Sequence, residues 1–326
     1  MTIMGFRAHF IGLLLAGTTA LSLGLSGCTT NPATGKSVFT GFMSPSQEME
    51  IGAEEHPKIL AEFGGTYDDP EIARYVVSIG ELLHATTEMP DRPFTFTIVD
   101  SPTVNAFALP GGYVYVTRGL MALANSEAEL AGVIAHEIGH VTARHPAQRY
   151  SHGMVASLGA TLLGILTESP DLGRLGRLAA GLYIQGYSRE QEYEADRLGV
   201  RYLARAGYDP MAMASFLKAL EADDALTQMI AGEKGAEPPL DLFRSHPRTA
   251  DRIVQAAQAA RGQVTRSLAL DRDIYLRKID GLVWGDSPDQ GYVKGRVFEH
   301  PALRFRFEAP PGFHMTNTDE AVFGEH

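Results

Sequence analysis

Residues 136–140 read His-Glu-Ile-Gly-His, and they continue an apolar run over residues 130–135 that is long enough to be helical. On a helix, His136 and His140 lie one turn apart and point the same way, so two imidazoles can bind one Zn²⁺. Glu137, beside them, can take a proton from a metal-bound water. The motif alone is moderately specific, so the rest of the chain must supply a third ligand, a helix start and a place for substrate.

A helix start stands directly before this motif. Ser126 is followed three residues later by a glutamate, which is the pattern of a capping box. The pattern predicts a helix over about residues 127–145, and Pro146 should end or kink it. On a continuing helix, His145 would point about 140° away from His140, so we expect it to be a surface or packing residue.

Composition indicates a globular protein with a substantial core. The chain has 326 residues, of which 44% are hydrophobic and 21% charged, and this length suggests one large or two modest domains. The formal net charge is −11, and there is no block of Lys and Arg. We therefore expect no nucleic-acid partner.

The first 27 residues have the features of a targeting segment. Arg7 and His9 form a short basic front, and residues 10–23 are mostly apolar but too few to span a bilayer comfortably. Small residues then precede Cys28, an arrangement that resembles the lipobox of bacterial lipoproteins. The resemblance implies a signal peptide over residues 1–27, cleavage before Cys28 and lipidation of its thiol. The alternative is a plain secretory signal with an incidental cysteine.

Cys28 is the only cysteine, so no intrachain disulfide forms and no thiolate is left for zinc or for nucleophilic catalysis. By the same resemblance, the non-acidic Thr29 favours the outer over the inner membrane of a Gram-negative-type envelope, with the protein facing the periplasm. Residues 28–44 are expected to be a flexible tether. No later segment reaches the roughly 18–20 apolar residues of a membrane span; the longest candidate, residues 154–166, contains glycines.

The remaining chain divides into two parts. Residues 45–264 are expected to form one mainly helical domain with a small β-sheet, because helical apolar spacing is interrupted by alternating residues over 94–99 and 113–116. Residues 265–326 again suggest strands and turns, either as an addition or as the start of a larger domain. The predicted fold class is therefore α+β.

A third metal ligand must be His, Asp or Glu, because no thiol is available. Residues 188–196 supply several acids. Glu192 and Asp196 are four apart on one helical face, which lets Glu192 bind metal while Asp196 accepts the outer ring N–H of a ligating histidine. Glu190 and Glu194 share a different face. The spacing alone is equally consistent with an acidic helix face that is exposed to solvent and binds no metal.

Three stretches together resemble the zinc metallopeptidases typified by the CaaX prenyl protease and the bacterial HtpX and BepA proteases. They are the motif at 136–140, the sequence Glu-Tyr-Glu-Ala-Asp at 192–196, and Ser-His-Pro at 245–247 with Arg252 downstream. The resemblance covers about residues 45–262. CaaX processing itself is not expected, since it belongs to enzymes that span the membrane several times.

The resemblance implies a gluzincin-type fold with one zinc per chain, Glu192 as the third ligand and Asp196 beside a ligating histidine. Glu137 would be the general base that takes the proton of the attacking water and passes it to the leaving amine. His246 and Arg252 would lie near the metal, with His246 donating to the transition-state oxyanion or capping the metal at rest. The alternative is that His246 begins a helix and Arg252 is a surface salt-bridge partner.

Substrate is expected to bind by strand addition. Asn105, Ala106 and Phe107 precede a Gly-Gly turn and can offer an exposed strand edge beside the zinc. Main-chain bonds to an extended peptide would give affinity with little sequence preference. The alternative, equally open, is that these residues are ordinary sheet core.

These features predict a lipid-anchored zinc endopeptidase, and the resemblance implies that it acts on unfolded or misassembled cell-envelope polypeptides. A second hypothesis is a chaperone-like lipoprotein with a closed or regulatory zinc site, which would have the outer-membrane assembly machinery as a partner. A third keeps the same ligands and hydrolyses non-peptide bonds. BepA carries helical repeats after its protease part, where this chain has β-like sequence.

Overall fold

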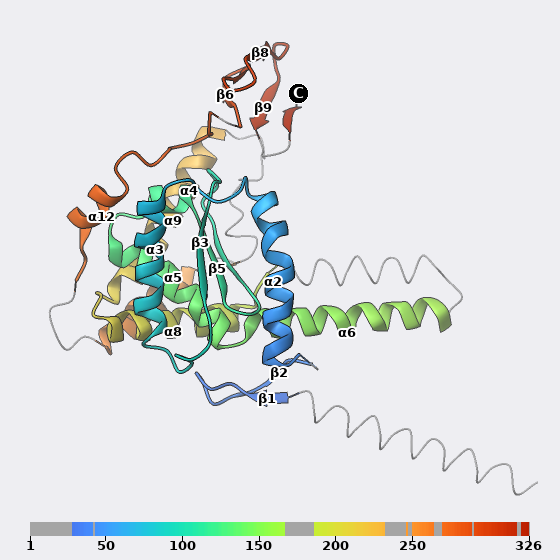
Figure 1. Ribbon diagram of the computed structural model, residues 1–326, viewed down its shortest axis with the longest axis vertical. Helices are drawn as coiled ribbons and strands as arrows, with labels where there is room; N and C mark the ends of the chain where they lie inside the picture. Colours follow the sequence, from blue (N-terminus) through green and yellow to red (C-terminus); the bar gives the residue numbers. More distant parts are fainter. Residues whose placement is uncertain are drawn as a thin grey trace, which may run out of the picture.

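The computed structural model describes residues 28–41, 43–166, 186–231, 246, 250–263, 269–288, 290–317 and 321–325. The predicted signal peptide, residues 1–27, lies outside them. The described chain forms a largely helical body around a small sheet, followed by a strand-rich C-terminal segment (Figure 1). The predicted α+β fold class is confirmed.

The helices of the body keep apolar residues on the faces that meet other elements. They are α2 (Pro45–Glu62), α3 (Pro70–His84), α4 (Arg118–Leu123), α5 (Glu127–Thr142), α6 (His145–Leu166), α8 (Arg189–Ala206), α9 (Met211–Ala231), α11 (Ala250–Arg261) and α12 (Arg272–Lys278). Side-chain caps begin several of them: Ser126 caps α5, and Ser188 caps α8 through a full capping box. Every residue of α5 after its first is buried, so α5 is the centre of the body.

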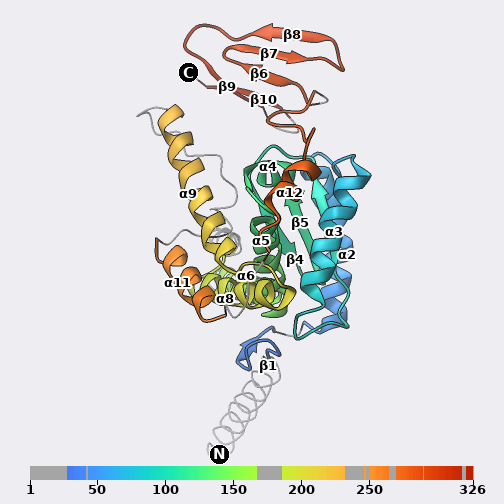
Figure 2. The same cartoon turned by 90° about the vertical axis from the view of Figure 1, so that its left-hand side faces the viewer.

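A three-stranded sheet covers one side of α5. It consists of β3 (Thr95–Val99), β4 (Ala106–Leu109) and β5 (Tyr113–Thr117) in the order β3-β5-β4, with β3 parallel and β4 antiparallel to β5. β4 is therefore an edge strand of this sheet, and it packs against α5. α8 and α9 pack against α5 as well, and Figure 2 shows the sheet, α5 and these helices together.

Residues 28–39 form an antiparallel hairpin of β1 (Cys28–Thr30) and β2 (Ser37–Phe39). We expected a flexible tether here, but Arg144 donates to the hydroxyl oxygen of Thr29 and the Lys36 ammonium donates to Glu194, so polar contacts hold the hairpin to the body. The limits of the tether and of the domains remain predictions.

The predicted helix over 127–145 ends earlier than expected. α5 stops at Thr142, Arg144 adopts a positive φ of 59°, and a new helix, α6, begins at His145. That left-handed residue reorients the chain, which a local pattern of helix-forming residues does not reveal. Conversely, α2 continues through Pro57, although a proline inside a helix usually ends or kinks it.

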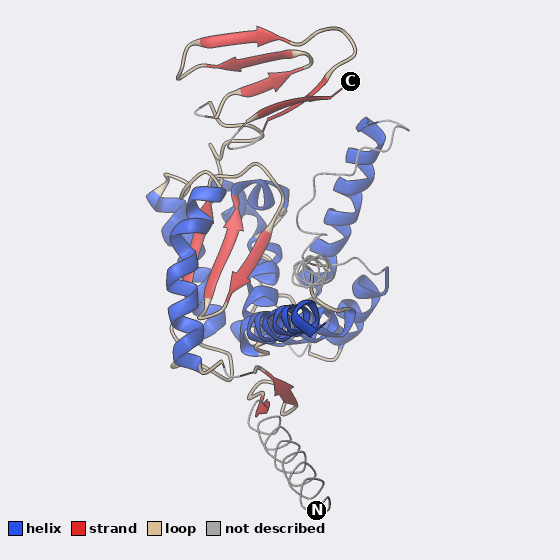
Figure 3. Ribbon diagram, turned by 90° about the vertical axis from the view of Figure 1, so that its right-hand side faces the viewer, coloured by secondary structure: helices blue, strands red, loops and turns tan. Residues whose placement is uncertain are grey.

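The C-terminal segment contains two small sheets above the body (Figure 3). One joins β6 (Tyr292–Lys294), β7 (Val297–His300) and β8 (Phe305–Glu308), and the other joins β9 (His314–Asn317) and β10 (Val322–Glu325). Arg118, which is fully buried, connects the body to the start of this segment through the carbonyls of Val283 and Gly285. In the described part of the chain, no helix is both long and apolar enough to cross a membrane.

Candidate metal centre

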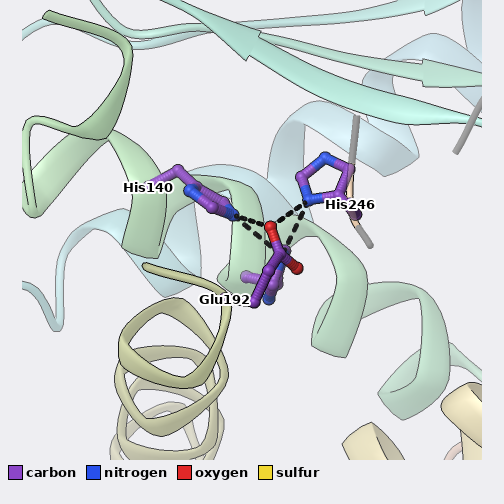
Figure 4. Close-up of side chains that lie close together, drawn as sticks. His140, Glu192 and His246 are labelled. Carbon is purple, nitrogen blue, oxygen red and sulfur yellow. Dashed lines mark hydrogen bonds and ion pairs between the residues drawn. The ribbon is translucent and has the colours of Figure 1, made fainter. Parts of the chain in front are cut away.

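Four buried side chains converge at the middle of the body. They are His136 and His140 from α5, Glu192 from α8 and His246 from the segment before α11, and one ligand atom of each lies within 4.8 Å of those of the others. Figure 4 shows three of them, His140, Glu192 and His246, close together. These four residues are 0–6% exposed. The structure thus brings together the two histidines of the motif, the predicted third ligand and the predicted nearby histidine.

Close packing of α5 against α8 makes this convergence possible. A Cβ added at Gly139 would lie 3.0 Å from the carbonyl oxygen of Ala195. A Cβ added at Gly199 would lie 3.1 Å from the backbone nitrogen of His136. Both glycines therefore let the backbones of the two helices approach where His136, His140 and Glu192 face one another.

The polar atoms of the cluster lie at short range. His136 Nε2 is 3.0 Å from His140 Nε2, and His140 Nε2 is 3.4 Å from Glu192 Oε1. His246 Nδ1 is 3.0 Å from Glu192 Oε1, while its Nε2 is 3.5 Å from Glu137 Oε1. Glu137, 1% exposed, therefore lies beside the cluster with one oxygen toward His246.

Asp196 and Arg252 support the cluster from behind. Arg252 donates from Nε and Nη2 to the two oxygens of Asp196, each at 2.8 Å, and its Nη1 lies 2.8 Å from Glu192 Oε2. Asp196 Oδ1 is also 2.9 Å from His136 Nδ1. Since Arg252 is 6% exposed, the alternative of a surface salt bridge is wrong: this pair is buried.

Burial and charge set the protonation of these groups. Burial raises the pKa of the Glu137 carboxyl and lowers the pKa of the His140 imidazole well below its usual value. Burial also opposes ionisation of Glu192, but the charges of His246 and Arg252 outweigh it and hold the pKa of Glu192 well below its usual range. A neutral His140 and an ionised Glu192 are the forms that bind a metal ion.

The donor set fits a zinc ion. Two imidazoles and one carboxylate are the ligands of a common type of catalytic zinc site, and His246 adds a fourth donor. Glu137 Oε2 and His246 Nε2 are buried and have no hydrogen-bond partner among the described residues, and Glu192 Oε2 has only the ion-pair contact with Arg252. Buried polar atoms without partners are rare, and a cation among them would satisfy the carboxylate oxygens.

His145 and Glu194, to which we assigned no role at the metal site from the sequence, lie next to the cluster. His145, 1% exposed, has Nδ1 at 2.9 Å from His140 Nδ1 and Nε2 at 3.2 Å from Glu194 Oε2. Lys36 donates to the other oxygen of Glu194 at 2.6 Å. His145 is therefore a buried packing residue that meets His140 at its outer nitrogen and is not one of the four clustered side chains, so of the two expected roles the surface one is wrong.

Tyr187 is a further neighbour that sequence reasoning missed. Its ring stacks on His140 with ring centroids 3.9 Å apart, and the Arg149 guanidinium lies 4.4 Å from the ring centroid. Tyr187 is 5% exposed, and it covers His140 from the side of α6. No motif marked this residue; its place beside Ser188, the cap of α8, is the only local hint in the chain.

The predicted substrate strand lies at the edge of the sheet. Ala106 and Phe107 belong to β4, whose ladder partner in the described structure is β5. Asn105 precedes the strand and is 5% exposed, and its Oδ1 has no hydrogen-bond partner among described residues. β4 packs against α5, the helix that carries His136, and the Ala106 side chain is fully buried in the core; the substrate role of this edge stays a prediction.

Comparison with known sequences gives a family match. The sequence model described as Peptidase family M48 matches residues 70–260, which contain the two histidines of the motif, Glu192, His246 and Arg252. The match thus covers more than half of the chain and the whole candidate metal centre.

Curated relatives match the same part of the chain. A putative beta-barrel assembly-enhancing protease of Vibrio cholerae is 36% identical over 242 residues, covering 71% of this chain and 48% of the relative. The beta-barrel assembly-enhancing protease of Escherichia coli is 31% identical over 246 residues, covering 72% and 48%. The mitochondrial metalloendopeptidase OMA1 of Arabidopsis thaliana is 32% identical over 176 residues, covering 54% and 33%. The chain spans about half the length of the two bacterial relatives.

Proposed function

The chain belongs to peptidase family M48, and from that premise we propose that it is a lipid-anchored endopeptidase for unfolded or misassembled cell-envelope polypeptides. As a member of this family it is a zinc metallopeptidase, a hydrolase of peptide bonds. The observation that carries the proposal is the buried cluster of His136, His140 and Glu192 with Glu137 beside it.

In this proposal, His136, His140 and Glu192 hold one zinc ion per chain. Zinc in a site of this kind acidifies a water molecule and polarises the carbonyl of the scissile peptide bond. Asp196 Oδ1, which lies 2.9 Å from His136 Nδ1, is proposed to fix the orientation of that ring, and Arg252 fixes Asp196 and Glu192 in turn. Arg252 is thus a positioning residue rather than a group that touches substrate.

Glu137 is proposed as the general base. Its raised pKa, which results from burial, brings the carboxylate closer to the proton affinity that a base needs near neutral pH. Glu137 accepts the proton of the attacking water and later gives it to the amine of the leaving chain. His246, whose Nε2 lies 3.5 Å from Glu137 Oε1, is proposed to donate to the oxyanion that forms on the carbonyl.

Substrate is proposed to bind as an added strand at the edge formed by Asn105, Ala106 and Phe107. The edge position of β4 and its packing against α5 support this proposal. Because the bonds are made by main-chain groups, they would hold extended, unfolded segments of many sequences. Folded proteins would be poor substrates.

The cellular setting is proposed from the sequence and from the names of the relatives. Lipidation of Cys28 would attach the protein to a membrane of the Gram-negative-type envelope, outer rather than inner, facing the periplasm. Two relatives are named for enhancing β-barrel assembly, so misassembled barrel proteins and the outer-membrane assembly machinery are the proposed substrates and partners. Since the match spans half of those relatives, this part rests on the shared domain alone.

Cleavage of unfolded casein tests the peptidase proposal directly. The chain from residue 28 onward is compared with Glu137→Gln, and bound zinc is quantified in both. We expect one zinc in each, with the rate lowered by about 10²–10⁴-fold in Glu137→Gln, as removal of a general base predicts. Equal rates in the two forms would refute the role of Glu137. A panel of ester and amide substrates separates peptide from non-peptide hydrolysis.

The second candidate, a closed or regulatory zinc site, has one observation in its favour. His246 Nδ1 lies 3.0 Å from Glu192 Oε1 and 3.3 Å from His136 Nε2, so His246 can occupy the position that an open catalytic zinc keeps for water. If wild type binds zinc and does not cut casein, His246→Ala should release activity. Activity of His246→Ala above that of wild type would support the closed site, because loss of an oxyanion donor cannot raise activity.

A further inference from the structure

α6 is an uncharged helix over most of its length, and it projects from the body (Figure 1). Apart from its histidines, Arg149 is the single basic residue in its sequence, and it holds no acid, although the whole chain has a net charge of −11. Met154, Val155 and Leu158 are 54%, 54% and 62% exposed. Large apolar side chains gathered at a protein surface mark a site of contact with another apolar phase.

These side chains form one wall of a groove, which we call the α6 groove. Its volume is about 330 Å³, near the lower limit for small-molecule pockets. β2 and the start of α2 form the other walls, with Gln47 and Glu50 as polar lining residues. The large apolar side chains that line it include Phe39, Met43, Ile51, Met154, Val155 and Leu158.

The α6 groove lies beside the predicted lipid attachment site. In the β1–β2 hairpin the backbone of Cys28 pairs with that of Phe39, and Phe39 lines the groove. The hydroxyl of Ser151, on α6, donates to the carbonyl of Thr40, which fixes the end of the hairpin against α6. Cys28 is paired with a residue that lines the groove, and strand residues advance only about 3.3 Å each. A lipid on Cys28 would therefore hold the groove close to the bilayer.

We propose that the α6 groove and the exposed apolar face of α6 dock on the bilayer, with the acyl chains of membrane lipid as the occupant. This inference rests on the proposed lipidation of Cys28. A second apolar contact beside an anchor strengthens attachment, since a single acyl chain binds a membrane marginally. Docking at two points, Cys28 and α6, also fixes the orientation of the body relative to the membrane.

Site-specific coupling to vesicles tests the docking. The chain from residue 28 onward contains all described elements and one cysteine, Cys28, so a maleimide phospholipid attaches it at the natural position. Trp284→Phe removes the single native tryptophan. Leu158→Trp then reports on α6, and Leu226→Trp, at a position 50% exposed on α9, is the matched control. Phosphatidylethanolamine–phosphatidylglycerol vesicles with brominated acyl chains quench tryptophan that enters the bilayer.

We expect loss of fluorescence for Leu158→Trp and none for Leu226→Trp. Adding Met154→Ser and Val155→Ser should abolish the quenching of Leu158→Trp. No quenching in Leu158→Trp, or equal quenching in both reporters, would overturn the proposal. A change in the fluorescence of Leu158→Trp on addition of unfolded casein, together with no quenching by lipid, would also overturn the proposal. That result would assign the groove to polypeptide.

This test separates the docking from the function on which it rests. Chemical coupling replaces lipidation in the cell, so a failure of lipidation, seen as absence of labelled fatty acid on the full chain, does not affect the quenching. Casein cleavage by the uncoupled chain is measured separately. Loss of cleavage with intact quenching would refute the peptidase proposal and leave the docking in place.

Discussion

His140 is held by a hydrogen-bond chain that runs outward to the N-terminal hairpin. Its Nε2 faces the cluster, so a neutral ligand must carry its proton on Nδ1. His145 Nδ1 can accept that proton, since the two atoms are 2.9 Å apart, and His145 Nε2 then donates to Glu194. Lys36 completes the chain by donating to Glu194. One tautomer of each histidine therefore satisfies the whole chain, and that tautomer is the one that binds metal.

Removal of His145 should therefore weaken zinc binding without touching a ligand. His145→Phe leaves the Nδ1 proton of His140 buried without an acceptor, and we expect about 10–100-fold lower zinc affinity or activity. Zinc affinity is measured by competition with a chelator. Lys36→Met, at a side chain 60% exposed, is the control and should change affinity little. Wild-type affinity in His145→Phe would show that the chain does not position His140.

At the scale of elements, the contact between α5 and α8 determines whether the cluster assembles. Gly139→Ala adds a Cβ 3.0 Å from the Ala195 carbonyl oxygen, so the backbone of α8 must give way by a few tenths of an ångström. Alanine is favoured over glycine within helices by about 1 kcal/mol, so a loss of stability would show that close packing outweighs propensity. We expect a net destabilisation of about 1–3 kcal/mol and weaker zinc binding.

Gly132→Ala is the matched control in the same helix. Its added Cβ would meet its nearest neighbours at 3.6 Å, which is an ordinary contact, so propensity should dominate. Thermal unfolding of both variants with zinc present gives the comparison. If Gly139→Ala were as stable as Gly132→Ala, the glycine would not be needed for helix contact.

Local patterns predicted the elements that carry the site, and long-range contacts escaped them. Ser126 and Ser188 cap their helices as their sequences suggest, because capping depends on residues three positions apart. The position of His145 depends on the left-handed backbone of Arg144, which no neighbouring residue type demanded. Lys36 meets Glu194 across 158 positions, and such a pairing exists only in the folded chain.

At the scale of the whole molecule, buried or bonded carboxylates connect distant elements and make stability depend on pH. Burial alone would raise the pKa of Glu88, but bonds from Tyr202 and Arg205 outweigh it and lower that pKa. A carboxyl with a lowered pKa in the folded state stabilises the fold at neutral pH, and this contribution is lost as pH falls through the folded pKa. The link that Glu88 makes between the loop after α3 and α8 is therefore strongest at pH values above the ordinary pKa of a carboxyl group.

Glu88→Gln should lower stability at neutral pH by about 1 kcal/mol and reduce the loss of stability on acidification. Denaturant unfolding at a series of pH values measures both effects. Glu81→Gln, at an exposed position on α3, is the control and should follow wild type throughout. An unchanged pH dependence in Glu88→Gln would mean that the ion pairs of Glu88 do not stabilise the fold.

Metal removal tests whether the cluster holds the body together. A zinc ion bound by His136, His140 and Glu192 would join α5 to α8, and ligand bound to the folded state stabilises it by about 2.7 kcal/mol at a hundredfold excess over Kd. Chelation by EDTA should therefore lower Tm by about 5–10 °C, because each kcal/mol of stability corresponds to about 2–4 °C in a domain of this size. Glu192→Ala, which lacks one ligand, should respond much less. If EDTA removes the zinc and leaves the Tm of wild type unchanged, the helix packing around Gly139 and Gly199 must hold the cluster in place without the metal.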